Sequence, residues 1–167
     1  MIALKKILVA TDFSEPSDAA LAYGREFARS FGAQLVVLHV VDNMLINAVG
    51  GDGFAFTDPD LQRAVEDQAK RQVDGLLSDE DRTQLGAQGT IVTSNRTALA
   101  IVEFAKDSDV NLIVMGTHGR GAMAHLLMGS IAERVVRLAP CPVLTVRHPE
   151  REFVLPDALV AVAKARQ

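Results

Sequence analysis

The order of apolar runs along the chain constrains its fold more than any other feature. Short, nearly continuous apolar runs of strand length alternate with longer segments whose apolar residues recur at helical spacing. Runs of the first kind are typical of strands covered on both faces, and their alternation with helices implies right-handed crossovers. The predicted strands are 6–10, 34–41, 90–93, 110–115 and 142–147. The sequence therefore predicts an α/β fold, with an open sheet of five parallel strands and helices on both faces.

Helices occupy the intervals between the predicted strands. The first begins behind the candidate N-cap Ser14 and ends at Gly32, and one of its faces collects Ala20, Gly24, Phe27, Ala28 and Phe31. The others are expected at 61–77, at 98–105 with Thr97 as cap, and around Ile131, Val135 and Leu138 as far as Pro140.

The rest of the chain suggests one domain with an appendage. Residues 43–60 form a long glycine-rich loop, which suggests a flap or an interaction surface. A single domain is predicted over 1–149, followed by an extension, 150–167, whose last eleven residues (DALVAVAKARQ) have the pattern of a helix.

Composition narrows the class of protein. The chain has 167 residues, 49% of them hydrophobic, which suits one packed domain and excludes a disordered chain. The net charge is −4 without the basic stripe of a nonspecific nucleic-acid or membrane-surface binder. The start, MIALKKILVATD, is too short and too charged for a signal peptide or membrane span, and the one cysteine, Cys141, can form no internal disulfide. We therefore expect a soluble, cytoplasmic protein.

Ligands of open parallel sheets bind at the carboxyl ends of the strands, near the switch in strand order. The glycine-rich segment GTHGRGAMAHLLMGS, residues 116–130, follows one such strand. A dinucleotide fingerprint does not fit it, because that motif belongs to the first strand-to-helix turn and needs an acidic residue after the next strand. A Walker A loop does not fit either, because Ala122 stands where lysine is required.

A different spacing remains, G-x2-G-x9-G-S, formed by Gly116, Gly119, Gly129 and Ser130. Glycines after a strand can expose amides to an anion, and a helix start adds further amides and a positive dipole end. The alternative is structural: Ser130 and Glu133 have the spacing of a capping box, and the first two glycines can serve a tight turn. The residues alone favour neither interpretation.

This segment resembles the nucleotide-binding signature of the universal stress protein family. The resemblance extends over most of the chain, through ILVATDFSEPSDAALAYGREFA, LVVLHVVD, IVEFAKDSDVNLIVMGTHGRG and LAPCPVLTVR. It implies a flavodoxin-like or Rossmann-like three-layer domain that commonly forms homodimers through the last strand, here Val143, Leu144, Thr145 and Val146. It also implies that a chain with these glycines binds ATP, and we expect Mg²⁺ to accompany the nucleotide.

The resemblance assigns roles to individual residues. Thr11 and Asp12 of VATD would lie near the adenine and ribose, and Val40 would offer backbone groups to the adenine. Met115 and Gly116 would flank the ribose and phosphates. The triphosphate would be lined by Gly119, Arg120, Gly129, Ser130 and Ile131. One departure is that Asn95-Arg96-Thr97 stands where the family often has G-x-P, which changes the turn chemistry near the site.

Other polar residues have simpler interpretations. No Ser, Cys or Asp is positioned by sequence to complete a triad with His118, so a loop histidine is favoured. His39 lies on a buried-type strand and is expected to be a packed core residue. The four histidines and Cys141 lack metal-ligand spacing, so no metal site within the protein is expected.

Three functions compete. The leading hypothesis is a homodimeric stress or signalling module that binds ATP and transmits that state to unidentified protein partners. The second is a slow ATPase or phosphotransferase, for which the sequence offers no general base. The third is an ATP-independent dimeric scaffold, in which the glycines serve only structure.

Overall fold

A computed structural model describes residues 2–44, 59–118 and 128–147. The described part contains a five-stranded sheet whose strands are all parallel, in the order β3-β2-β1-β4-β5. The strands are β1 Lys6–Ala10, β2 Gln34–Val41, β3 Gln88–Thr93, β4 Leu112–Gly116 and β5 Val143–Val146. The helices are α1 Glu15–Phe31, α2 Pro59–Gly75, α3 Asp79–Leu85, α4 Thr97–Asp107 and α5 Ser130–Leu138. The predicted α/β architecture is confirmed.

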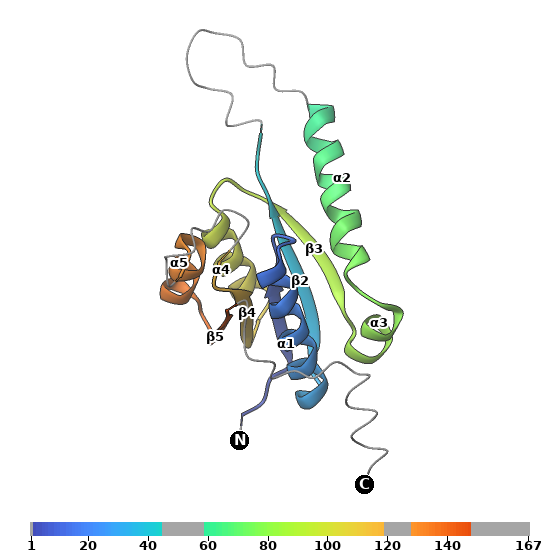
Figure 1. Cartoon of the computed structure of the whole chain (residues 1–167), viewed down its shortest axis with the longest axis vertical. Coiled ribbons are helices and arrows are strands. Elements are labelled where there is room, and N and C mark those ends of the chain that lie inside the picture. The colour runs from blue at the N-terminus through green and yellow to red at the C-terminus, as the bar shows by residue number, and fades with distance from the viewer. Residues whose placement is uncertain (1, 45–58, 119–127, 148–167) are drawn as a thin grey trace.

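Helices cover both faces of the sheet. In Figure 1, α1 crosses in front of the sheet, α2 and α3 lie on the side of β3, and α4 and α5 lie on the side of β4 and β5. One core joins Ile7, Val9, Leu35, Val37 and Val114 to α1, α2 and α3, and the other joins Leu8, Val36, Leu38, Ile113 and Met115 to α4 and α5. Alternate strand residues thus enter different cores, which is why the central strands are apolar at every position.

Gly24 brings α1 close to the sheet. A Cβ atom added at Gly24 would lie 2.3 Å from Cγ2 of Val9, a fully buried residue of the central strand. The helix therefore packs against β1 at a distance that only glycine permits. At the other end of the same helix, Gly32 has φ 62° and is the C-cap, as the sequence predicts.

Two helix predictions fail in detail. Helix α3 was not foreseen, because its seven residues, DEDRTQL, carry one large apolar side chain and no periodicity. It is held instead by a capping box between Ser78 and Asp81 and by Gly86, whose φ of 53° ends it. Helix α4 begins at Thr97, behind Arg96, so Thr97 is the first helical residue and the prediction that it is the cap was wrong.

Other expectations fall outside the described ranges. The 157–167 helix and the boundary at 149–150 belong to residues that the structure does not describe, as do 45–58 of the predicted 43–60 loop. Within the described ranges, no helix combines the length and the apolar character needed to cross a bilayer.

Candidate functional site

The strand order reverses between β1 and β4. From β1 the chain continues to its neighbour β2 on one side, whereas β4 leads to β5 on the other. We call the carboxyl ends of these two strands, with the residues that follow them, the switch edge. Open α/β sheets bind their ligands at such a point, because the two outgoing connections diverge to opposite faces.

The turn after β1 is held by its own side chains. The Thr11 hydroxyl accepts a hydrogen bond from the Phe13 amide (3.0 Å) and shares another with the Ser17 hydroxyl (3.0 Å). Thr11 is therefore buried and its side chain is used inside the turn. Ser14 is the N-cap of α1, as predicted, and its amide donates to Ser17 Oγ (3.0 Å).

Asp12 is half-buried at the start of this turn. Its Oδ1 accepts hydrogen bonds from the Ser14 amide (3.2 Å) and from the Ser14 hydroxyl. These bonds fix the carboxylate at the carboxyl end of β1. The structure thus places Asp12 at the switch edge, where the sequence predicts a contact with a ligand.

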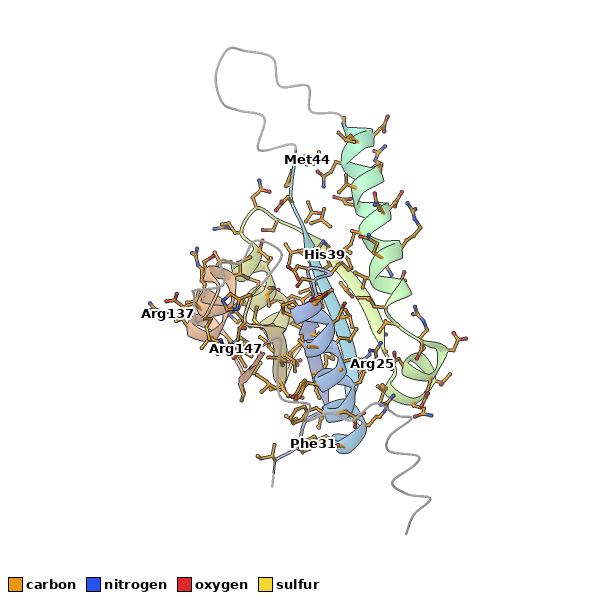
Figure 2. All side chains as sticks on the ribbon, in the orientation of Figure 1. Arg25, Phe31, His39, Met44, Arg137 and Arg147 are labelled. Carbon is orange, nitrogen blue, oxygen red and sulfur yellow. The ribbon has the colours of Figure 1, made fainter. Side chains whose placement is uncertain are left out.

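His39 reaches the same turn from β2. Its ring Nδ1 donates to the Thr11 carbonyl (2.8 Å), and its ring lies 4.4 Å, centroid to centroid, from that of Phe13. Figure 2 shows it near the N-terminal end of α1. His39 is thus half-buried against Phe13 and is not the core residue that the sequence predicts. Its hydrogen bond could not be predicted from the sequence, because it depends on how two strands align.

The ladder between β1 and β2 ends beside Val40. Its last bond runs from the Thr11 amide to the Leu38 carbonyl (2.9 Å). Val40, two residues further along β2, presents its peptide groups on the same side, past the end of β1. The side chain of Val40 packs into the core of α4 and α5, so only its backbone groups can face a ligand at the switch edge.

The end of β4 packs tightly against neighbouring backbone. The Thr117 amide donates to the Val146 carbonyl (2.8 Å), and the Gly129 amide donates to the Thr117 carbonyl (2.8 Å). A Cβ at Gly116 would lie 2.9 Å from Cβ of Pro16, and one at Gly129 would lie 3.2 Å from the Thr117 carbonyl oxygen. Both glycines therefore allow a close approach of neighbouring backbone, and the bond from Gly129 to Thr117 holds the start of α5 beside the end of β4.

The start of α5 has no side-chain cap. Its N-cap is Gly129, so the predicted capping box of Ser130 and Glu133 was wrong. The reason is that the chain enters the helix one residue earlier, which makes Ser130 the first helical residue. The first helical bond runs from the Glu133 amide to the Gly129 carbonyl (2.9 Å), so the amides of residues 130–132 precede the ladder.

The remaining candidate residues differ in how exposed they are to a ligand. Ser130 and Ile131 are exposed. Met115 is buried in the core, so its backbone alone can reach a ligand. Gly119 and Arg120 lie outside the described residues.

The arrangement suits an elongated ligand that is anionic at one end and carries hydrogen-bonding groups at the other. Amide donors and a positive helix end lie at β4 and α5, and a carboxylate and an open peptide edge lie at β1 and β2. Two strand spacings, about 10 Å, separate β2 from β4. In the described part of the chain, no group of three or more His, Cys, Asp or Glu side chains is placed to hold a metal ion.

Comparison with known proteins gives a consistent result. The model of the universal stress protein family matches residues 3–147. Universal stress protein MJ0531 of Methanocaldococcus jannaschii is 32% identical over 149 residues, which cover 89% of this chain and 85% of that protein. A universal stress protein of Thermus aquaticus is 34% identical over 143 residues, or 86% of this chain and 98% of that protein.

Solved structures share the fold. Hypothetical protein MJ0577 of Methanocaldococcus jannaschii has a TM-score of 0.69 at 26% identity, covering 90% of this chain and all of that one. A universal stress family protein from Burkholderia pseudomallei has a TM-score of 0.62 at 31% identity, covering 86% of this chain and 96% of that one.

Proposed function

The chain belongs to the universal stress protein family, and from that premise we propose that it is a stress or signalling module that binds ATP at the switch edge. The uncapped start of α5 carries the proposal, because its amides have no side-chain cap and adjoin the turn after β4. A triphosphate satisfies such amides and gains from the positive end of the helix.

In this proposal, different residues contact the base, the ribose and the phosphates. The Val40 peptide receives the adenine edge, and Asp12 lies beside the base and ribose. The backbone of Met115 and Gly116 flanks the ribose and the first phosphates. Gly129, Ser130 and Ile131 hold the remaining phosphates, together with Gly119 and Arg120 of the same glycine-rich segment. Mg²⁺ is expected to arrive with the phosphates, which supply the hard oxygen ligands that it prefers.

Structures of the same fold with nucleotides support this choice of ligand class. A universal stress protein from Archaeoglobus fulgidus has been solved in complex with dAMP, and another universal stress protein in complex with cAMP. Both ligands contain an adenine base and a phosphate, the two parts for which the switch edge has hydrogen-bonding groups.

We also propose a homodimer that forms through β5. This strand lies at one edge of the sheet, so no strand of the described residues pairs with its outer side. The Ile113 and Thr117 amides bond to the carbonyls of Pro142 and Val146, so the even-numbered peptides of β5 face β4. The peptides of Val143 and Thr145 consequently face outward, where a second copy can extend the sheet. We place this dimer in the cytoplasm, where the free thiol of Cys141 stays reduced.

Calorimetric titration of ligand-free protein tests the binding proposal. ATP with Mg²⁺, ATP with EDTA, and AMP are compared on the same preparation. We expect saturable binding of ATP that weakens when the two outer phosphates are removed. Absence of heat and of thermal stabilisation with ATP would contradict the proposal and favour a scaffold. Phosphate release in the same samples decides whether the bound nucleotide is hydrolysed.

A further inference from the structure

The β1–β2 ladder stops one step short of Val40. Since the Thr11 amide bonds to the Leu38 carbonyl, the next step would join the Val40 amide to the Thr11 carbonyl. The same step would join the Phe13 amide to the Val40 carbonyl. Continued in this way, the ladder would use both peptide groups that the proposed adenine contact requires.

Two side chains take the places of these bonds. The His39 ring donates to the Thr11 carbonyl (2.8 Å), and the Thr11 hydroxyl accepts from the Phe13 amide (3.0 Å). A carbonyl only accepts, so His39 Nδ1 carries a hydrogen atom in this contact. The two groups of the turn that would bind Val40 are thereby occupied, one by a side chain of β2 and the other by a side chain of the turn.

The backbone of the turn also departs from a strand at this point. Phe13 has φ 63°, in the left-handed region that residues other than glycine rarely adopt. Its ring packs against His39, with a centroid distance of 4.4 Å and planes inclined by 39°. A conformation of this kind persists where its surroundings hold it, and it is often found at ligand sites. His39 makes both contacts, one to Thr11 and one to Phe13.

We propose that His39 is a positioning residue that ends the β1–β2 ladder and thereby presents the Val40 peptide to a purine base. The inference rests on the proposed function and deepens it, because it names what makes the site selective for the base. His39 itself lies on the α1 face of β2, opposite to the Val40 side chain, and acts through the turn.

The test compares two nucleotides on three proteins. Dissociation constants for ATP and UTP, both with Mg²⁺, are measured for the wild type, His39→Phe and His39→Asn. UTP has the same ribose and triphosphate as ATP but a different base edge, so it reports the phosphate end alone. Phe keeps the ring and removes the donor, whereas Asn keeps a donor near the position of Nδ1 and removes the ring.

We expect the wild type to prefer ATP. His39→Phe should weaken ATP binding by about tenfold, the effect of one lost hydrogen bond, and leave UTP binding unchanged. His39→Asn should keep most of the preference for ATP. Urea unfolding without ligand shows whether each variant is folded at the titration temperature.

Each contrary result has a separate meaning. If the wild type binds no ATP, the proposed function fails. If it binds ATP and UTP equally, or if His39→Phe keeps the ATP preference, nucleotide binding stands but the role of His39 is overturned. An equal loss for both nucleotides in His39→Phe also overturns it, because a general structural effect does not distinguish bases.

Discussion

At the scale of single residues, position relative to a helix start decides what a serine does. Ser78 is the N-cap of α3, and its hydroxyl accepts from the Asp81 amide (3.0 Å). Ser130 is the first helical residue of α5 and has no such bond. The sequence motif is similar at both places, yet only one of the two hydroxyls stabilises its helix.

This difference predicts opposite outcomes for two matched substitutions. Ser78→Ala should lower the free energy of unfolding by about 1 kcal/mol and leave ATP affinity unchanged. Ser130→Ala should leave stability nearly unchanged and weaken ATP binding, because the hydroxyl is free to contact a phosphate. Urea unfolding and calorimetric titration check both quantities. A Ser130→Ala protein that loses stability but binds ATP normally would mean that the serine serves the helix alone.

Gly24 offers a second test at the residue scale. Gly24→Ala should destabilise the protein by about 1–3 kcal/mol, because the added methyl group overlaps Val9 and forces neighbouring atoms of the packed core to shift. Gly75→Ala is the matched control: it lies at the end of α2, where an added Cβ meets nothing within 4 Å. It should be neutral or stabilising by up to about 1 kcal/mol. Equal effects in urea unfolding would mean that α1 can move away from β1.

Glu66 links pH to stability. Hydrogen bonds from Gln62 (2.9 Å) and Thr93 (2.7 Å) hold the pKa of this carboxyl below its ordinary value of 4.5. A lowered folded-state pKa means that the ionised form stabilises the fold. This contribution is complete above the unfolded pKa and is lost as the pH falls through the folded pKa.

Thr93→Val should therefore destabilise the protein most at neutral pH. The difference from the wild type should shrink as the pH falls below 4.5, because a protonated carboxyl accepts a weaker hydrogen bond. Thr83→Val is the control, since the Thr83 hydroxyl donates to backbone carbonyls of Asp79 and Glu80 and involves no titrating group. Urea unfolding across the pH range measures both, and a pH-independent loss in Thr93→Val would refute the linkage.

At the scale of elements, α3 depends on one ionic contact with α1. Asp81 is 2% exposed and accepts from Arg25 Nε (3.0 and 3.2 Å) and from the Ser78 amide (3.1 Å). Arg25 also donates to the Leu76 carbonyl (2.6 Å), so it joins α1 to the connection before α3. A short helix without an amphipathic pattern is thus stabilised by tertiary contacts.

Asp81→Ala should cost about 3 kcal/mol, because it removes a buried partner of Arg25 and the capping contact together. Arg137→Ala is the control at an exposed i,i+4 pair with Glu133, where both side chains are more than half exposed. It should change stability by less than about 0.5 kcal/mol. Circular dichroism during urea unfolding measures both. A small loss in Asp81→Ala would show that α3 is held mainly by Leu77 and Leu85.

At the scale of the whole molecule, the proposed dimer depends on outward peptides of β5. Thr145→Pro removes one outward N–H and leaves the bonds from β5 to β4 in place. Light scattering during size-exclusion chromatography should show a dimer for the wild type and a monomer for this variant.

Thr145→Val is the matched control and should remain dimeric, because it keeps the backbone donor. Thermal melting checks that the proline variant is folded. A wild-type monomer, or a proline variant that remains dimeric, would place any dimer interface elsewhere. If dimers form as proposed, dilution should lower the melting temperature of the wild type more than that of Thr145→Pro.

The fold followed from the sequence because it depends on local pattern. Apolar runs such as 34–41 and helical spacing such as that of Ala20, Gly24 and Ala28 each limit a segment to one element, and their alternation leaves a parallel sheet. The same reasoning located Asp12 and the start of α5 at carboxyl ends of strands. It missed α3, which lacks apolar periodicity and is held in part by Arg25, a residue more than fifty positions away.

By itself, the sequence determined the family and the alternation of strands and helices apart from α3, and it predicted the edge of the sheet at which a ligand would bind. The tertiary structure alone decided which groups at that edge are available. Ser130 is released from capping because the chain enters α5 at Gly129, and the Val40 peptide is left open because His39 and Thr11 occupy its partners. The physical reason is that a hydrogen bond depends on where two segments meet in space, which the order of residues within either segment does not specify.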